Sequence, residues 1–148
     1  MAFRIRSLGV VAAVVAAELL WVVAEAVLGL QLQAPAGPGY PEPVDIGPLN
    51  VAVAAGGLAL LGWAALAVLE RLTPQARQLW LGLALAALAA SLAMPLSGTG
   101  VSAANRAVLV LMHLIVGTVV ITVLYRTSPR RALQPTPFAA RVPRGDAG

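Results

Sequence analysis

Four long apolar blocks, separated by short polar breaks, dominate the chain. They run near Leu8–Leu30, Leu49–Leu69, Leu79–Met94 and Val108–Tyr125. A helix of about 20 residues crosses the hydrocarbon core of a bilayer. The pattern therefore predicts an all-α fold, a four-helix transmembrane bundle. The expected helices cover residues 6–31, 48–70, 74–95 and 103–126.

The breaks between the blocks carry residues that begin or end helices. The first break, residues 31–47, is rich in Pro and Gly and predicts an extended, irregular path. Pro48 is placed to begin the second helix, and Thr73–Pro74 to begin the third. Pro95 is expected to end the third helix and Ser102 to cap the fourth.

Small and aromatic residues add packing information. Small side chains at every fourth position let helices approach closely in lipid, where packing drives association. Trp80 and Tyr125 lie near helix ends and are typical of an interfacial belt, whereas Trp21 lies deeper and is expected to pack inside. The small residues with this spacing are Gly9, Ala13 and Ala17, then Ala52 and Gly56, then Gly82, Ala86 and Ala90.

Composition agrees with a membrane protein. Apolar residues make up 59% and charged residues 11% of the 148 residues, against about 45–50% and about 25% in soluble domains. The net charge of +4 comes from arginines that flank the apolar blocks, without an aromatic-interleaved basic surface, so nucleic-acid binding is not expected. The chain has no cysteine, which excludes disulfides, thiolate metal sites and thiol catalysis.

The arginines also predict the orientation. With four spans, nine of the ten arginines fall on one side and only Arg106 falls on the other. Because basic residues are retained on the cytoplasmic side, both termini should be cytoplasmic in a multi-pass protein of the cell inner (plasma) membrane. Residues 127–148 are rich in Pro and Arg and predict a disordered basic cytoplasmic tail.

Two acidic residues, Glu18 and Glu25, interrupt the first block. A charged side chain at mid-bilayer costs about 2.5–3.5 kcal/mol on insertion scales, so it usually has a partner or a function. Their spacing of seven residues places both on one helix face, about 10 Å apart. Arg106 and His113 have the same spacing on the fourth helix. If the two faces touch, depth orders the side chains as a polar ladder of Arg106, Glu25, His113 and Glu18.

Three interpretations of this ladder stay open. It fastens the first helix to the fourth, with Glu18 neutral; or it is a proton-linked site for a small ligand or ion; or Glu18, Glu25 and His113 bind a metal, although they supply only one nitrogen ligand. No nucleophile elbow or phosphate loop occurs, so no enzyme activity, catalytic residue or cofactor is expected.

The segment Leu111–Met112–His113–Leu114, with Gly117 and a closing Arg126, resembles the hallmark of an actinobacterial family of small four-helix membrane proteins, a domain of unknown function. Stretches 18–25 and 69–80 are similar to the same family, and the resemblance covers about residues 4–126. It implies an integral membrane protein without an assigned activity. Ala17–Glu18 is also similar to the membrane-embedded Glu of small multidrug resistance transporters, whose loop glycine and helix-three tryptophan motifs are missing here.

The sequence thus predicts a small bacterial integral membrane protein of unassigned activity, with a polar site between the first and fourth helices. One alternative is a proton-coupled small-molecule carrier with Glu18 as the proton switch, and another is an accessory subunit of a larger membrane complex. The expected partners are the lipid bilayer and either a second copy of the chain or another membrane protein.

Overall fold

The computed structural model describes residues 2–37, 39 and 41–128. Four helical spans in this part are long and apolar enough to cross a membrane, which confirms the all-α, four-helix class. Of the predicted tail, all but Thr127 and Ser128 lies outside the described residues. The spans are α1 (Ala2–Val22) continued by the π-helical turn η1 (Val23–Val27), α2 (Pro48–Leu72), α3 (Ala76–Ser91) followed by the short α4 (Ala93–Ser97), and α5 (Ala103–Thr127).

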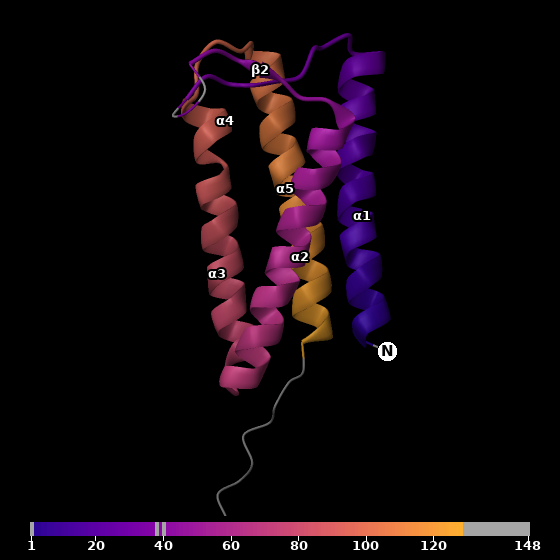
Figure 1. The fold of residues 1–148 in the computed structure, drawn as a ribbon, viewed down its shortest axis with the longest axis vertical. Coiled ribbons are helices and arrows are strands. Elements are labelled where there is room, and N and C mark those ends of the chain that lie inside the picture. Colours follow the sequence, from indigo (N-terminus) through magenta and orange to yellow (C-terminus); the bar gives the residue numbers. More distant parts are fainter. Residues whose placement is uncertain (1, 38, 40, 129–148) are drawn as a thin grey trace, which may run out of the picture.

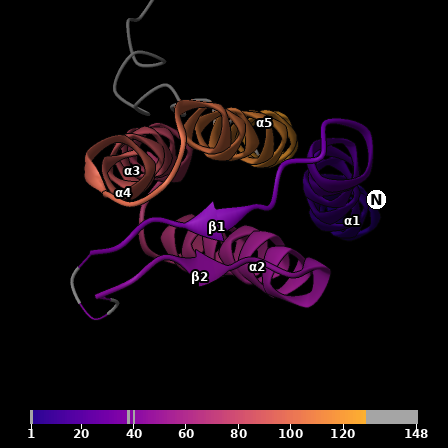
Figure 2. The ribbon, with the colours of Figure 1, turned by 90° about the horizontal axis from the view of Figure 1, so that it is seen from above.

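The spans pack side by side, with α2 and α5 between α1 and α3 (Figure 2). α1 packs most extensively against α5 and α2, whereas α3 packs against α2 and α5. The N-terminus lies at one end of the bundle, and the connection between α1 and α2 crosses the other (Figure 1). We call these the N-terminal end and the hairpin end.

The outside of the bundle is apolar, as a membrane span requires. Along α2, the side chains of Leu49, Val53 and Leu61 are 65–74% exposed. In each span, at most 22% of the residues in the most apolar window are buried. Lipid tails solvate such a surface, whereas a water-soluble monomer rarely exposes one. The chain is therefore a multi-pass membrane protein.

Small residues line the contacts of α1 with its neighbours. Ala13 and Ala17 are buried, and Gly9 approaches α5 so closely that an added Cβ would stand 2.6 Å from Val123 Cγ1. The small-residue prediction is confirmed for α1. It is wrong for α3, where Gly82, Ala86 and Ala90 are all exposed on the surface.

The connection between α1 and α2 is paired, not irregular as predicted. β1 (Gln33–Ala34) and β2 (Val44–Asp45) form an antiparallel sheet that crosses the hairpin end (Figure 2). Leu32 and Pro35 beside it are fully buried. An added Cβ on Gly98 would stand 2.6 Å from the Pro35 Cβ, so the α4–α5 turn is in close contact with this connection. The burial of these two residues holds the connection onto the helices.

Two helix starts agree with the sequence signals. Pro48 is the first residue of α2. The Ser102 Oγ accepts a hydrogen bond from the Asn105 backbone N–H (3.1 Å), which caps α5 as predicted.

The third span begins and ends at residues other than those predicted from the sequence. α3 begins at Ala76, two residues later than predicted, because Thr73 ends α2 and its Oγ1 accepts the Gln75 N–H (3.2 Å). Pro95 does not end the span. It has no N–H to donate to the Ser91 carbonyl, so α3 breaks there and the chain continues as α4.

Trp80 lies inside the bundle, so its predicted interfacial position is wrong. Its side chain is 2% exposed and packs with Leu66 of α2 and Leu124 of α5. The Nε1–H donates to the Gly62 carbonyl (2.8 Å), which gives the indole a polar partner in the core. Trp21 is half-buried and packs against the buried cluster of Ala17, Val51 and Ala55, which agrees with the packing role predicted for it.

Candidate functional site

The four polar residues predicted to form a ladder each have contacts other than the predicted ones. Among the described residues, no hydrogen bond or ion pair joins any two of Glu18, Glu25, Arg106 and His113. The predicted ladder is therefore not formed. A functional role for each of the four residues stays a prediction.

The rotation of α5 about its own axis explains the difference. α1 and α5 do pack together, but Val123 is the α5 residue that meets Gly9 of α1. Gly117 lies one turn beyond His113 on the same face. An added Cβ on Gly117 would stand 2.7 Å from Leu88 Cδ1, so this face of α5 is turned toward α3.

Glu25 stabilises the end of the first span. In η1 the Leu28 N–H bonds to the Val23 carbonyl (3.0 Å), five residues back instead of four. The Glu25 carboxylate accepts the Leu32 backbone N–H (2.8 Å). Gly29, with φ of 63°, reverses the chain between them. Glu25 thus fastens the connection that leads to β1.

Arg106 holds the turn before α5. Its guanidinium donates to the carbonyls of Leu96 and Gly98, the latter at 3.0 Å. Carbonyls at a helix end have no partner within the helix and accept such side-chain donors. Arg106 therefore secures the end of α4.

Asn105, which the sequence did not single out, anchors β1 on α5. Its side chain is buried, its Oδ1 accepts the Gln33 N–H (2.9 Å), and its Nδ2 donates to the Gln33 carbonyl (2.8 Å). A neighbouring strand in a sheet makes the same pair of bonds. The only signal in the sequence is a neutral polar side chain directly before Arg106, within the first turn of a largely apolar helix.

A polar cluster of Arg6, Glu70 and Thr127, here called the clamp, joins α1, α2 and α5 at the N-terminal end. Arg6 donates to both carboxylate oxygens of Glu70 (2.6 and 3.2 Å). It also donates to the Oγ1 and the carbonyl of Thr127 (both 3.1 Å). The Arg6 and Glu70 side chains are 8% and 22% exposed. A signal was present, because Glu70 is the one acidic residue on the arginine-rich side within residues 1–128.

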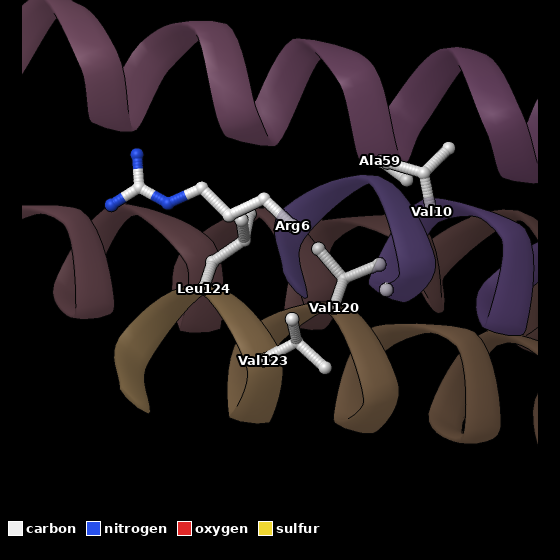
Figure 3. Close-up of a pocket in the computed structure, with 7 residues that line it drawn as sticks. Arg6, Val10, Ala59, Val120, Val123 and Leu124 are labelled. Atoms are coloured by element: carbon white, nitrogen blue, oxygen red, sulfur yellow. The ribbon is translucent and has the colours of Figure 1, made fainter. Parts of the chain in front are cut away.

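A small cavity lies beside the clamp. Figure 3 shows the Arg6 side chain passing it, with apolar side chains of α1, α2 and α5 around it. Its volume of about 10 Å³ is room for about one water molecule. An organic substrate does not fit there. The lining residues are Arg6, Gly9, Val10, Ala59, Val120, Val123 and Leu124.

Glu18 and His113 lie near the middle of their spans. Glu18 is three residues beyond the midpoint of Phe3–Val27, about 4.5 Å along the axis. The His113 Nδ1 donates to the Leu109 carbonyl of its own helix (2.7 Å). Glu18 Oε1 is buried and has no hydrogen-bond partner among the described residues.

The geometry does not support the metal-site interpretation. In the part of the chain that the structure describes, no group of three or more His, Asp or Glu side chains could hold a metal ion. Glu18, Glu25 and His113 thus do not form a ligand set.

Comparison with known proteins identifies one relationship. The model of a family of unknown function (DUF6069) matches residues 2–130, which confirms the resemblance to a domain of unknown function. The actinobacterial origin and the hallmark in the last helix stay predictions. No curated protein and no solved structure matches the chain.

Proposed function

This chain belongs to a family of unknown function (DUF6069), and we propose that it is a non-enzymatic accessory subunit that binds another transmembrane helix at Glu18. One observation carries the proposal. Glu18 Oε1 is buried near mid-span without a hydrogen-bond partner among the described residues. Oε2 of the same carboxylate is not buried in this way and makes no hydrogen bond among the described residues, so a partner helix donates its N–H or O–H to Oε2 at this depth.

The energies favour such a partner modestly. A buried acceptor without a donor costs about 1–3 kcal/mol. Measured hydrogen bonds between membrane helices stabilise helix association by about 0.6–1.7 kcal/mol each. A helix with a donor at this depth is therefore preferred about three- to fifteenfold over an apolar helix of the same shape. The hydrogen bond to Glu18 thus favours one partner helix over another, and packing between the helices supplies the rest of the affinity.

The surface beside Glu18 can receive a helix. Val15 and Val22 lie one turn before and one turn after Glu18 on the same face of α1. Their side chains are 49% and 45% exposed. The partner helix lies along these residues.

The carrier alternative has less support. A carrier needs a chamber for its substrate, and the cavity beside the clamp, with room for about one water molecule, is too small to be that chamber. Glu18 is not among its lining residues. A carrier would bind its substrate in a pH-dependent way and lose this binding in Glu18→Gln, whereas an accessory subunit binds a protein.

The test is photo-crosslinking in cells. A photoreactive phenylalanine derivative replaces Val15 or Val22, and, as a matched control, Leu83 on α3, which is 55% exposed. We expect a discrete protein adduct from positions 15 and 22 that Glu18→Leu removes and Glu18→Gln retains. Adducts from position 83 should not depend on Glu18. No adduct at either α1 position, or an adduct that Glu18→Leu leaves unchanged, contradicts the proposal.

The membrane and the orientation complete the proposal. We place the chain in the plasma membrane with the N-terminal end on the cytoplasmic side. Within the described residues this end carries Arg4, Arg71 and Arg126 on its surface. Alkaline phosphatase, which is active only outside the cytoplasm, should be active when inserted after Glu42 and inactive when fused after Gly148. The reverse result contradicts this orientation.

A further inference from the structure

We infer that Arg77 binds the phosphate group of an anionic phospholipid at the N-terminal end. Arg77 is the second residue of α3, and its guanidinium carbon lies 3.7 Å from the centroid of the Tyr125 ring on α5. Stacking fixes the plane of the guanidinium, and the N–H groups of its terminal nitrogens Nη1 and Nη2, which are not buried as Nε is, remain free to donate along the edge. This is the geometry that pairs with a phosphate.

Arg77 lacks an anionic partner within the described residues. Its Nε is buried without a hydrogen-bond partner, and its guanidinium forms no ion pair there. Glu70, the carboxylate of this end, already binds Arg6 through both oxygens. The charge of Arg77 therefore calls for an anion from outside the bundle.

Position along the span selects a lipid as the source of this anion. Arg77 is the second residue of the span Ala76–Ser97, so its half-buried side chain lies where hydrocarbon meets headgroups. Tyrosine is enriched at this level, and Tyr125 forms the base of the site. Gln75 precedes α3 without a side-chain cap, so the positive end of the helix dipole adds to the attraction.

Neighbouring charges strengthen the site without competing for it. Arg4, Arg71 and Arg126 are exposed at the same end. Such residues attract anionic lipids diffusely. Arg77 differs from them because Tyr125 fixes its orientation and because it is half-buried. Its contribution to the affinity for an anionic lipid should therefore be larger than that of an exposed arginine.

The test measures lipid binding to the full-length protein in detergent by native mass spectrometry, with phosphatidylglycerol and phosphatidylcholine as probes. Arg77→Gln should lower the affinity for phosphatidylglycerol more than tenfold, the value of hydrogen bonds to a charged group. Arg4→Gln, which removes the same charge from an exposed site, should lower it about fivefold or less. Binding of phosphatidylcholine should not change.

Two further variants separate the site from a general loss of structure. Tyr125→Leu keeps every arginine and should still lower phosphatidylglycerol binding about two- to fivefold, because the stacked orientation is lost. Arg77→Lys keeps the charge but not the planar fork and should bind less tightly than wild type.

The opposite results are equally clear. Equal losses in Arg77→Gln and Arg4→Gln, or unchanged binding in Tyr125→Leu, would overturn the inference. Displacement of the lipid by millimolar inorganic phosphate would overturn the choice of a lipid, whereas retention of the lipid supports it. Neither result depends on Glu18, so this inference and the proposed function can fail separately.

Discussion

The clamp gives a prediction whose magnitude follows from its geometry. Glu70→Leu leaves the Arg6 guanidinium, 8% exposed, without its counter-charge. Removal of one partner from a buried ion pair costs about 3–5 kcal/mol. Two of the four hydrogen bonds of Arg6 go to Thr127 and survive. The lower end of this range, about 3 kcal/mol, is therefore expected.

The double variant Arg6→Met/Glu70→Leu is the matched control. It removes both charges and fills the same space with apolar side chains, a replacement that is often neutral or stabilising. The double variant should therefore recover most of the stability that Glu70→Leu loses. Thr127→Val removes the hydroxyl, which accepts from Arg6 and donates to the Val123 carbonyl of its own helix, and should cost about 1 kcal/mol.

Equilibrium unfolding in mixed detergent micelles, titrated with sodium dodecyl sulfate, measures these free energies. The four proteins of the cycle (wild type, the two single variants and the double variant) give the coupling energy between Arg6 and Glu70. A coupling below about 1 kcal/mol, the value of a surface ion pair, would refute the claim that the clamp is a buried fastener. A double variant as unstable as Glu70→Leu would refute the explanation by uncompensated charge.

Three further predictions follow from particular contacts. Asn105→Leu should destabilise the protein by about 1–3 kcal/mol and speed hydrogen exchange at the Gln33 amide, because both bonds to β1 are lost; unchanged exchange would show that Asn105 does not anchor the strand. Gly98→Ala should lower the free energy of unfolding by about 1–3 kcal/mol, because the added Cβ meets Pro35 and the Met94 carbonyl. Gly57→Ala has open space around it and should leave this free energy unchanged or slightly raised. Chemical denaturation measures both values, and equal effects of the two variants would contradict the packing. Glu18→Gln and Glu18→Leu should melt in detergent at or above the wild-type temperature, because each removes an unpartnered carboxyl; a clear fall would make Glu18 a structural fastener.

Local sequence signals predicted the spans and several of their ends. Pro48 and Ser102 begin or cap helices for reasons contained in one or two residues, and both are confirmed. The signal at Thr73–Pro74 failed because Thr73 serves the end of α2 instead. Among the candidate polar residues, Glu18 is the one whose sequence signal, an acid near mid-span, corresponds to an unusual site in the structure.

The partners of the other polar residues depend on distant segments. Glu25 and Arg106 each bind backbone groups of a nearby turn, and no pattern of side chains in the sequence predicts this role. Arg6 and Glu70 are 64 residues apart in the chain, and their pairing requires α1 and α2 to be placed first. Trp80 likewise finds the Gly62 carbonyl only once α2 and α3 are packed together.

The sequence by itself determined that this chain crosses a membrane with four helices, because a span must be long, apolar and internally hydrogen-bonded. It did not determine how each helix is rotated. In a soluble protein, a polar outer face would reveal that rotation. In lipid, the outer and inner faces are equally apolar, so the fit of small residues such as Gly9 against Val123 and Gly117 against Leu88 decides it. The rotation of α5 set by these contacts turns His113 toward α3, and the predicted ladder therefore does not form.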